Sequence, residues 1–183
     1  MESVGKDKTI FAIVFYIMFL LGWYIVSFGV LIPFYSAATH QDETHYSFTF
    51  VARSTAFILG CLTIRPLLRL CTKQTLILAN LVLISLSLLL CSLSYNSYNL
   101  AITLFISAFG IINLMVLCPT IILKTFTHNQ PDRWLLAVGI GFAIGASLTP
   151  LLIQHLRFHT YQLLSFLFTL PIPLLNKISL PEI

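Results

Sequence analysis

Arg53 lies about two turns inside an apolar run of the sequence, where a charged side chain is costly and usually functional. Arg53 occurs within the run 47–70, and none of the long apolar runs contains an acidic residue. Its guanidinium can reach a nearby membrane interface or bind a lipid phosphate, or it can contact a substrate or a neighbouring subunit. Asp42 and Glu43 precede the run, and they can pair with Arg53 if the connecting loop folds back.

Two amides, Asn80 and Asn113, also lie inside apolar runs. They can hydrogen-bond across helices and hold them together, or they can help to bind a sugar in a pocket that combines amides with aromatic rings. Trp23 and Tyr24 can supply such rings, although deep aromatic residues in a helix bundle more often belong to its core. Carboxylates that would bind a coupling cation are absent from these runs.

Sequence patterns of enzymes and metal sites are absent. The histidines and cysteines show neither HExxH nor CxxC spacing, which zinc and redox sites use. Neither a glycine-rich phosphate loop nor a serine nucleophile motif occurs. We therefore expect no catalytic residue, no metal and no cofactor apart from bound phospholipid. The cysteines are expected to act as small packing residues.

The composition indicates a membrane protein. Hydrophobic residues make up 58% of the chain and charged residues only 9%, whereas soluble domains contain roughly a quarter charged residues. A membrane helix needs about 20 consecutive apolar residues, and six runs approach or exceed that length. The predicted spans cover residues 9–36, 47–70, 75–93, 100–123, 134–154 and 160–175.

We expect these spans to form one all-α bundle over residues 1–183. Because the connections are short, consecutive helices should be antiparallel neighbours. The last span is shorter than the others and contains Pro171 and Pro173, so it should begin earlier than its apolar run or end as a broken helix.

The basic residues favour one side of this bundle. Eight of the ten precede the first span, close the second, or follow the fourth and sixth, and they are Lys6, Lys8, Arg65, Arg69, Lys73, Lys124, Arg133 and Lys177. Arg157 lies on the other side, and Arg53 lies within the second span. The positive-inside rule then places both termini on the cytoplasmic side, or on the equivalent side of an organelle membrane. An organelle inner membrane is compatible with this distribution. Since the basic residues are spread over several loops, they do not indicate a nucleic-acid partner.

A short pattern in the second span recurs in the fifth. Gly60 is followed by Leu-Thr and Pro-Leu-Leu, and so is Gly145. Spans two and five are corresponding members of two three-helix units, which have opposite topology in an alternating bundle. The pattern therefore predicts two inverted repeats, although so short a match also arises by chance.

The fifth span also contains a GxxxG pattern formed by Gly141 and Gly145. Glycines at this spacing let two helix backbones approach closely. We expect Gly141, Gly145 and the nearby Pro150 to serve helix packing inside the bundle, with a dimer face as the alternative.

The end of the second span resembles the loop signature of the major facilitator superfamily. That signature consists of a glycine, three residues, Asp-Arg, any residue, a second glycine and a basic pair. Gly60, Arg65 and Arg69 match it. Ile64 stands at the aspartate position, and leucines stand at the second glycine and at the first basic position.

Two later segments point to one branch of that superfamily. Residues 139–152 and 170–174 are similar to the fifth and sixth helices of the sodium-dependent glucose transporter-like branch. The resemblance implies the amino-terminal, six-helix half of a carrier. In the family, the signature aspartate takes part in a charged latch between the two halves, and Ile64 cannot form it. One bundle alone also lacks the partner against which alternating access operates.

Two functions are consistent with these observations, besides a chain without a role of its own. The first is a structural or accessory subunit, derived from a transporter half and held among other integral membrane subunits and lipids. The second is a half-size carrier of a sugar-like solute, which works as a dimer or with a separate second half. Polar side chains that converge on a hydrated cavity at mid-depth would indicate the carrier, and filled packing there would indicate the subunit.

Overall fold

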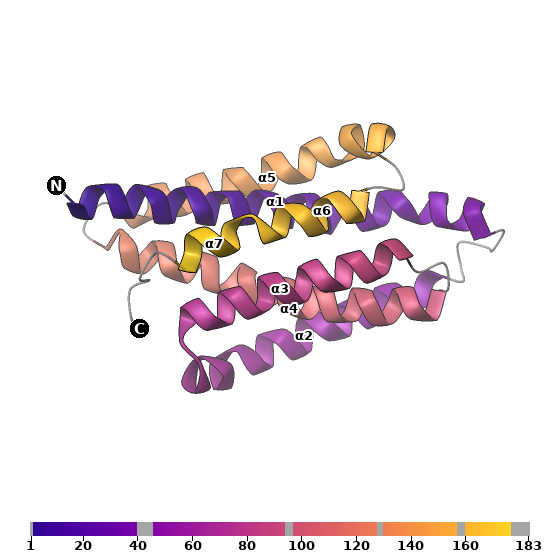
Figure 1. Ribbon diagram of the computed structural model, residues 1–183, viewed down its shortest axis with the longest axis horizontal. Coiled ribbons are helices and arrows are strands. Elements are labelled where there is room, and N and C mark those ends of the chain that lie inside the picture. Colours follow the sequence, from indigo (N-terminus) through magenta and orange to yellow (C-terminus); the bar gives the residue numbers. More distant parts are fainter. Residues whose placement is uncertain (1, 40–45, 94–96, 128–129, 157–159, 177–183) are drawn as a thin grey trace.

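The computed structural model describes residues 2–39, 46–93, 97–127, 130–156 and 160–176, and the regular structure in these ranges is helical (Figure 1). The helices are α1 (Glu2–Thr39), α2 (Ser47–Leu70), α3 (Lys73–Leu93), α4 (Ser97–Thr125), α5 (Pro131–Leu156), α6 (Thr160–Thr169) and α7 (Pro171–Asn176). The prediction of an all-α protein is confirmed for this part of the chain.

Helices α1 to α5 are each long and apolar enough to cross a membrane. A further apolar segment, Gln162–Pro173, is shorter. These lengths are consistent with an integral, multi-pass membrane protein, as the composition predicted. Helix α2 has the predicted bounds, whereas the other four begin or end beyond theirs, because polar residues at the membrane edge can continue a helix.

The last predicted span, 160–175, is not one continuous helix. Helix α6 ends at Thr169 and α7 begins at Pro171. Leu170 forms a turn between them, and its amide donates a hydrogen bond of 3.3 Å to the Leu167 carbonyl. Proline lacks an amide hydrogen and disfavours helical geometry at the residue before it. Pro171 therefore breaks the helix, which is one of the two outcomes that the sequence allowed.

Helices α1 to α6 run alternately in opposite directions and α7 continues in the direction of α6, so the beginning of α1 and the end of α7 lie toward the same end of the bundle (Figure 1). Helix α1 packs along α5, α2 packs along α4, and α3 lies against both α4 and α6. The expectation that consecutive helices would be close neighbours is therefore wrong for most of them, although α3 and α4 do pack together. Among α1 to α5, α4 is the most buried, whereas α2 and α5 are the least buried.

Glycines bring the backbones of α1 and α5 into direct contact. A Cβ added at Gly22 would overlap the carbonyl oxygen of Phe142, and one added at Gly145 would overlap the carbonyl oxygen of Phe19. A Cβ added at Gly141 would press on an aromatic ring of α1. The GxxxG pattern therefore lies against α1 within the bundle, and this contact makes α1 and α5 partners despite their separation in sequence.

Replacing Gly145 by alanine is expected to lower the melting temperature of the detergent-solubilised protein. The new methyl group would meet the backbone of α1, which cannot move aside as a flexible side chain can, and overpacking of this kind costs about 1–3 kcal/mol. The matched control is Gly139→Ala on the same helix, because nothing lies within 4 Å of a Cβ added there. This control should melt at or above the wild-type temperature, and equal melting of the two variants would contradict the backbone contact.

Candidate functional site

Arg53 is buried where α2 faces α1, toward the end of the bundle at which α2 begins. Its side chain is 9% exposed. It shares one buried face of α2 with Thr49, Ala56, Gly60 and Ile64. The spacing of three and four residues places these side chains on a single face of the helix. The amphipathic register of α2 therefore turns the arginine inward rather than toward lipid.

Aromatic rings and a backbone carbonyl surround the guanidinium of Arg53. One of its terminal nitrogens donates a hydrogen bond of 3.2 Å to the carbonyl oxygen of Ile25. Its central carbon lies 5.7 Å from the ring centres of Tyr24 and Phe28 and 5.4 Å from that of Phe57. A cation within about 6 Å of a ring face is attracted to it, by about 0.5–2 kcal/mol. These five residues are called the Arg53 cage below.

The cage compensates the charge of Arg53 only in part. The Nε atom is buried and has no hydrogen-bond partner among the residues that the structure describes, and a buried donor without a partner costs about 1–3 kcal/mol. The acidic residues in the described ranges all lie in the first two turns of α1 and α5, at the opposite end of the bundle. Asp42 and Glu43, the carboxylates considered as partners from the sequence, lie outside the described residues.

Ser107 of α4 contacts the Tyr24 side chain of the Arg53 cage. The hydroxyl groups of Tyr24 and Ser107 are 2.6 Å apart, and Ser107 donates a second hydrogen bond of 3.1 Å to the Leu104 carbonyl. Since a serine hydroxyl has one hydrogen, Tyr24 is the donor in the first bond. Both side chains are fully buried. Helices α1, α2 and α4 therefore meet around Arg53, and the Tyr24 ring is held in one orientation.

Asn80 and Asn113 form a second polar contact, between α3 and α4. The Nδ2 atom of Asn113 donates to Oδ1 of Asn80 at 3.2 Å, and Nδ2 of Asn80 donates to the Leu76 carbonyl at 2.7 Å. Both side chains are buried, and Oδ1 of Asn113 has no partner within the described ranges. The structure thus brings the two amides together, and their bond joins two helices directly.

Trp23 and Tyr24 belong to the packed interior and do not form an open platform. They are 5% and 0% exposed, respectively. Tyr24 is part of the Arg53 cage, and the Trp23 carbonyl accepts a hydrogen bond of 3.2 Å from the hydroxyl of Thr149. Of the two alternatives that the sequence left for these rings, the structure shows the packed one.

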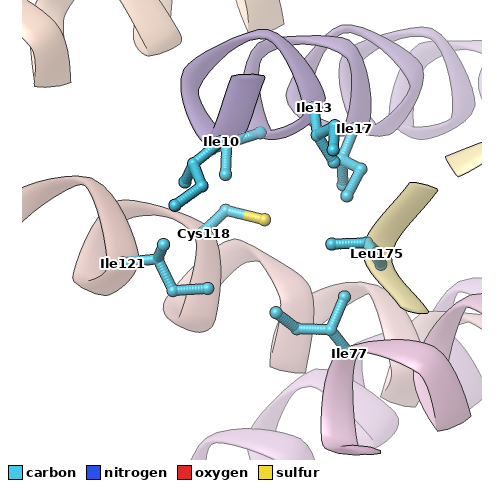
Figure 2. Close-up of a pocket in the computed structure, with 8 residues that line it drawn as sticks. Ile10, Ile13, Ile17, Ile77, Cys118, Ile121 and Leu175 are labelled. Atoms are coloured by element: carbon cyan, nitrogen blue, oxygen red, sulfur yellow. The ribbon is translucent and has the colours of Figure 1, made fainter. Parts of the chain in front are cut away.

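A small apolar cavity lies between α1, α3, α4 and α7 (Figure 2). It leaves about 10 Å³ for the centre of a water-sized sphere, and it is lined by Ile10, Ile13, Val14, Ile17, Ile77, Cys118, Ile121 and Leu175. This volume is near the lower limit for one water molecule, which also needs two or more polar partners. The Cys118 thiol is the one polar group of the lining, so the cavity is a dry packing defect rather than a solute site.

The residues that resemble the family signature lie on a continuous helix and not in a loop. Gly60 is buried, and a Cβ added there would overlap the side chain of Ile112 on α4. Arg65 and Arg69 are exposed near the end of α2, whereas Ile64 is buried. Arg69 lies in the last turn, where a cation is favourable to the helix dipole.

In the repeated pattern of α2 and α5, both glycines face a neighbouring helix. Gly60 faces α4 and Gly145 faces α1. The threonines differ, because Thr149 is buried and donates to a carbonyl of α1, whereas Thr63 donates to carbonyls of its own helix. The threonine follows the glycine by three residues in α2 and by four in α5, which turns the two side chains to different faces. Pro150 is exposed.

No protein-family model matches the chain, and a search of the curated proteins finds no match. The interpretation of the Arg53 cage therefore rests on its own geometry. That geometry combines a cation, three ring faces, one carbonyl and one buried N–H donor without a partner, at Nε. Such a group can attract an anion by charge and bind it through the remaining N–H groups.

Sequence reasoning identified Arg53 but not the residues around it. A signal for Phe57 was present, because it follows Arg53 by four residues, the spacing at which side chains of one helix meet. Tyr24, Phe28 and Ser107 come from other helices. Their approach depends on how α1 packs against α2 and α4, which residue spacing along the chain does not encode.

Replacing Asn113 by leucine is expected to lower stability, because Oδ1 of Asn80 then loses its partner in an apolar interior. Hydrogen bonds between membrane helices contribute about 0.6–2 kcal/mol. The coupling free energy between Asn80→Leu and Asn113→Leu, measured from the melting of the four proteins in detergent, should fall in that range.

The matched control for this cycle is Thr120→Val, also on α4, whose hydroxyl bonds to its own helix at the Val116 carbonyl. Its coupling with Asn80→Leu should be close to zero. A similarly small coupling for the two amides would show that their hydrogen bond does not join the helices.

Proposed function

We propose that the chain is a structural subunit of a larger membrane assembly, built on six spans that correspond to one half of the major facilitator fold. In this proposal α6 and α7 together form the sixth span, and two inverted three-helix units make up the bundle. Both termini lie on the cytoplasmic side or its equivalent. Lipids and other integral membrane subunits cover the apolar outer surface.

The pattern of helix pairing supports the two inverted units. If α1 is exchanged with α4, α2 with α5 and α3 with α6, the α1–α5 pair becomes the α4–α2 pair, and the α3–α6 pair remains in place. Gly60 and Gly145 lie at equivalent points of the two exchanged pairs, each against the partner helix. Inverted repeats are related in this way.

The observation that supports the proposal is that two pairs of polar side chains inside the bundle bond to each other across helices. Tyr24 pairs with Ser107 at 2.6 Å, and Asn113 pairs with Asn80 at 3.2 Å. All four side chains are buried. A carrier needs polar groups around a site near the bilayer midplane that its solute can enter. The cavity of Figure 2 is apolar and far too small for a sugar.

The position of Ile64 supports the same function. Its side chain is 6% exposed and stands where the resemblance places the aspartate of the latch. An isoleucine there adds to the packing of the bundle and offers no charge to a second half. Arg65, the next residue, is exposed, so its guanidinium is available to anionic headgroups on the basic side.

Purification from native membranes in a mild detergent tests the proposal. We expect the chain to migrate together with other integral membrane chains in one native-gel band. Gly145→Leu, which blocks the contact between α1 and α5, should lose these partners, whereas the control Gly139→Ala should keep them. After reconstitution into liposomes, the wild-type chain should take up labelled glucose no faster than empty liposomes do. A lone dimer that takes up sugar above that rate would contradict the proposal and favour the half-size carrier.

A further inference from the structure

We infer that the Arg53 cage binds the phosphate of an anionic phospholipid, in the leaflet at the end of the bundle where α2 begins. The inference names a ligand for one site. It requires that α1 and α2 cross a membrane, but it holds whether the bundle is a subunit or a carrier. Its failure would therefore leave the proposed function untouched.

The first argument is the unused binding capacity of the guanidinium. An arginine side chain has five N–H donors, and the contacts of Arg53 in the described part of the chain use one of them, on the Ile25 carbonyl. The Nε–H group is buried without a partner, so the unused terminal N–H groups are the ones that an external anion can meet. Phosphate oxygens are suited to these groups, because they accept two parallel hydrogen bonds from the fork of a guanidinium and supply the missing negative charge.

The second argument is depth. Arg53 stands six residues after Ser47, the first residue of α2. At 1.5 Å per residue, it lies about 9 Å along the helix from the end at which α2 begins. An arginine side chain and local thinning of the bilayer together cover such a distance, so a headgroup phosphate at this end is within reach.

The third argument is an opening beside the guanidinium. Gly29 follows Ile25 by one turn, so its amide is the helical partner of the carbonyl that Arg53 contacts. Gly29 is exposed, and nothing lies within 4 Å of a Cβ added there. Among the residues that the structure describes, the surface of α1 at Gly29, one turn from the Ile25 carbonyl, is therefore uncovered.

The surroundings favour a lipid over a soluble anion. Ile58 and Leu59, which follow Arg53 on α2 and lie farther from the end at which α2 begins, are 63% and 41% exposed. A soluble phosphate or carboxylate would leave these side chains uncovered, whereas a phospholipid would cover them with its acyl chains while its phosphate meets the guanidinium. The cage accordingly matches a molecule that is anionic at one end and apolar at the other.

Counting retained lipids by native mass spectrometry tests the inference. Full-length protein in detergent is incubated with equal amounts of phosphatidylglycerol and phosphatidylcholine that have the same acyl chains. Wild-type protein should retain phosphatidylglycerol about tenfold better. Arg53→Gln should remove this preference, whereas Arg53→Lys should keep part of it, since an ammonium group keeps the charge but lacks the fork.

The matched control is Arg65→Gln, which removes an exposed arginine of the same helix and should leave the preference at Arg53 unchanged. If Arg53→Gln fails to fold, the variant Gly29→Leu tests the inference instead, because leucine fills the opening at Gly29 and leaves the guanidinium in place. This variant should also lose the preference, and its retention of the wild-type preference would overturn the inference.

Three other results would overturn it. An equal loss in Arg53→Gln and Arg65→Gln would indicate general attraction of lipid to basic residues. A preference that appears only in the Asp42→Asn, Glu43→Gln variant would show that the protein's own carboxylates occupy the guanidinium. Stabilisation of wild-type protein but not Arg53→Gln by inorganic phosphate, without any lipid preference, would identify a soluble anion as the ligand.

Discussion

The contact on which this bundle depends is the meeting of two helix backbones where glycines leave no side chain between them. Lipid tails are as apolar as the residues they touch, so the burial of apolar side chains does not drive membrane helices together. Close packing between the helices is needed instead. Gly22 and Gly145 provide it for α1 and α5. With one side of α1 fixed in this way, its other side is free to meet α2 and α4, and the Tyr24 hydroxyl and the Ile25 carbonyl reach their partners there.

Helix α4 forms side-chain hydrogen bonds with two other helices in the interior of the bundle. Its Ser107 bonds to α1 and its Asn113 bonds to α3, while Ile112 packs on the glycine face of α2. Because lipid offers no alternative partner to a polar group, each of these bonds also selects one arrangement of the helices. Four buried polar atoms have no hydrogen-bond partner in the described ranges: Trp23 Nε1, Arg53 Nε, Ser85 Oγ and Asn113 Oδ1. Arg53 is the charged residue among them, and charged residues inside a membrane are usually functional.

The positions of the helices could be predicted from the sequence, because the length of an apolar run can be read directly from it. The bounds of α2 agree with the prediction. The break before Pro171 was foreseeable because the effect of proline is local. Helix partners were not: the Gly141 and Gly145 pattern indicated a close contact but not that α1 would make it. Arg53 was identifiable from its charge alone, whereas the rings of Tyr24 and Phe28 reach it only through the fold.

Helix α1 is longer than a bilayer is thick. Its 38 residues correspond to about 57 Å, whereas the hydrocarbon core measures about 30 Å. Even its apolar run, residues 9–36, has 28 residues, or about 42 Å. A helix with such a hydrophobic mismatch leans away from the membrane normal or thickens the bilayer around it. Since the backbones of α1 and α5 touch, α5 has to lean with α1, and the thickness of the host membrane would set the inclination of both helices together.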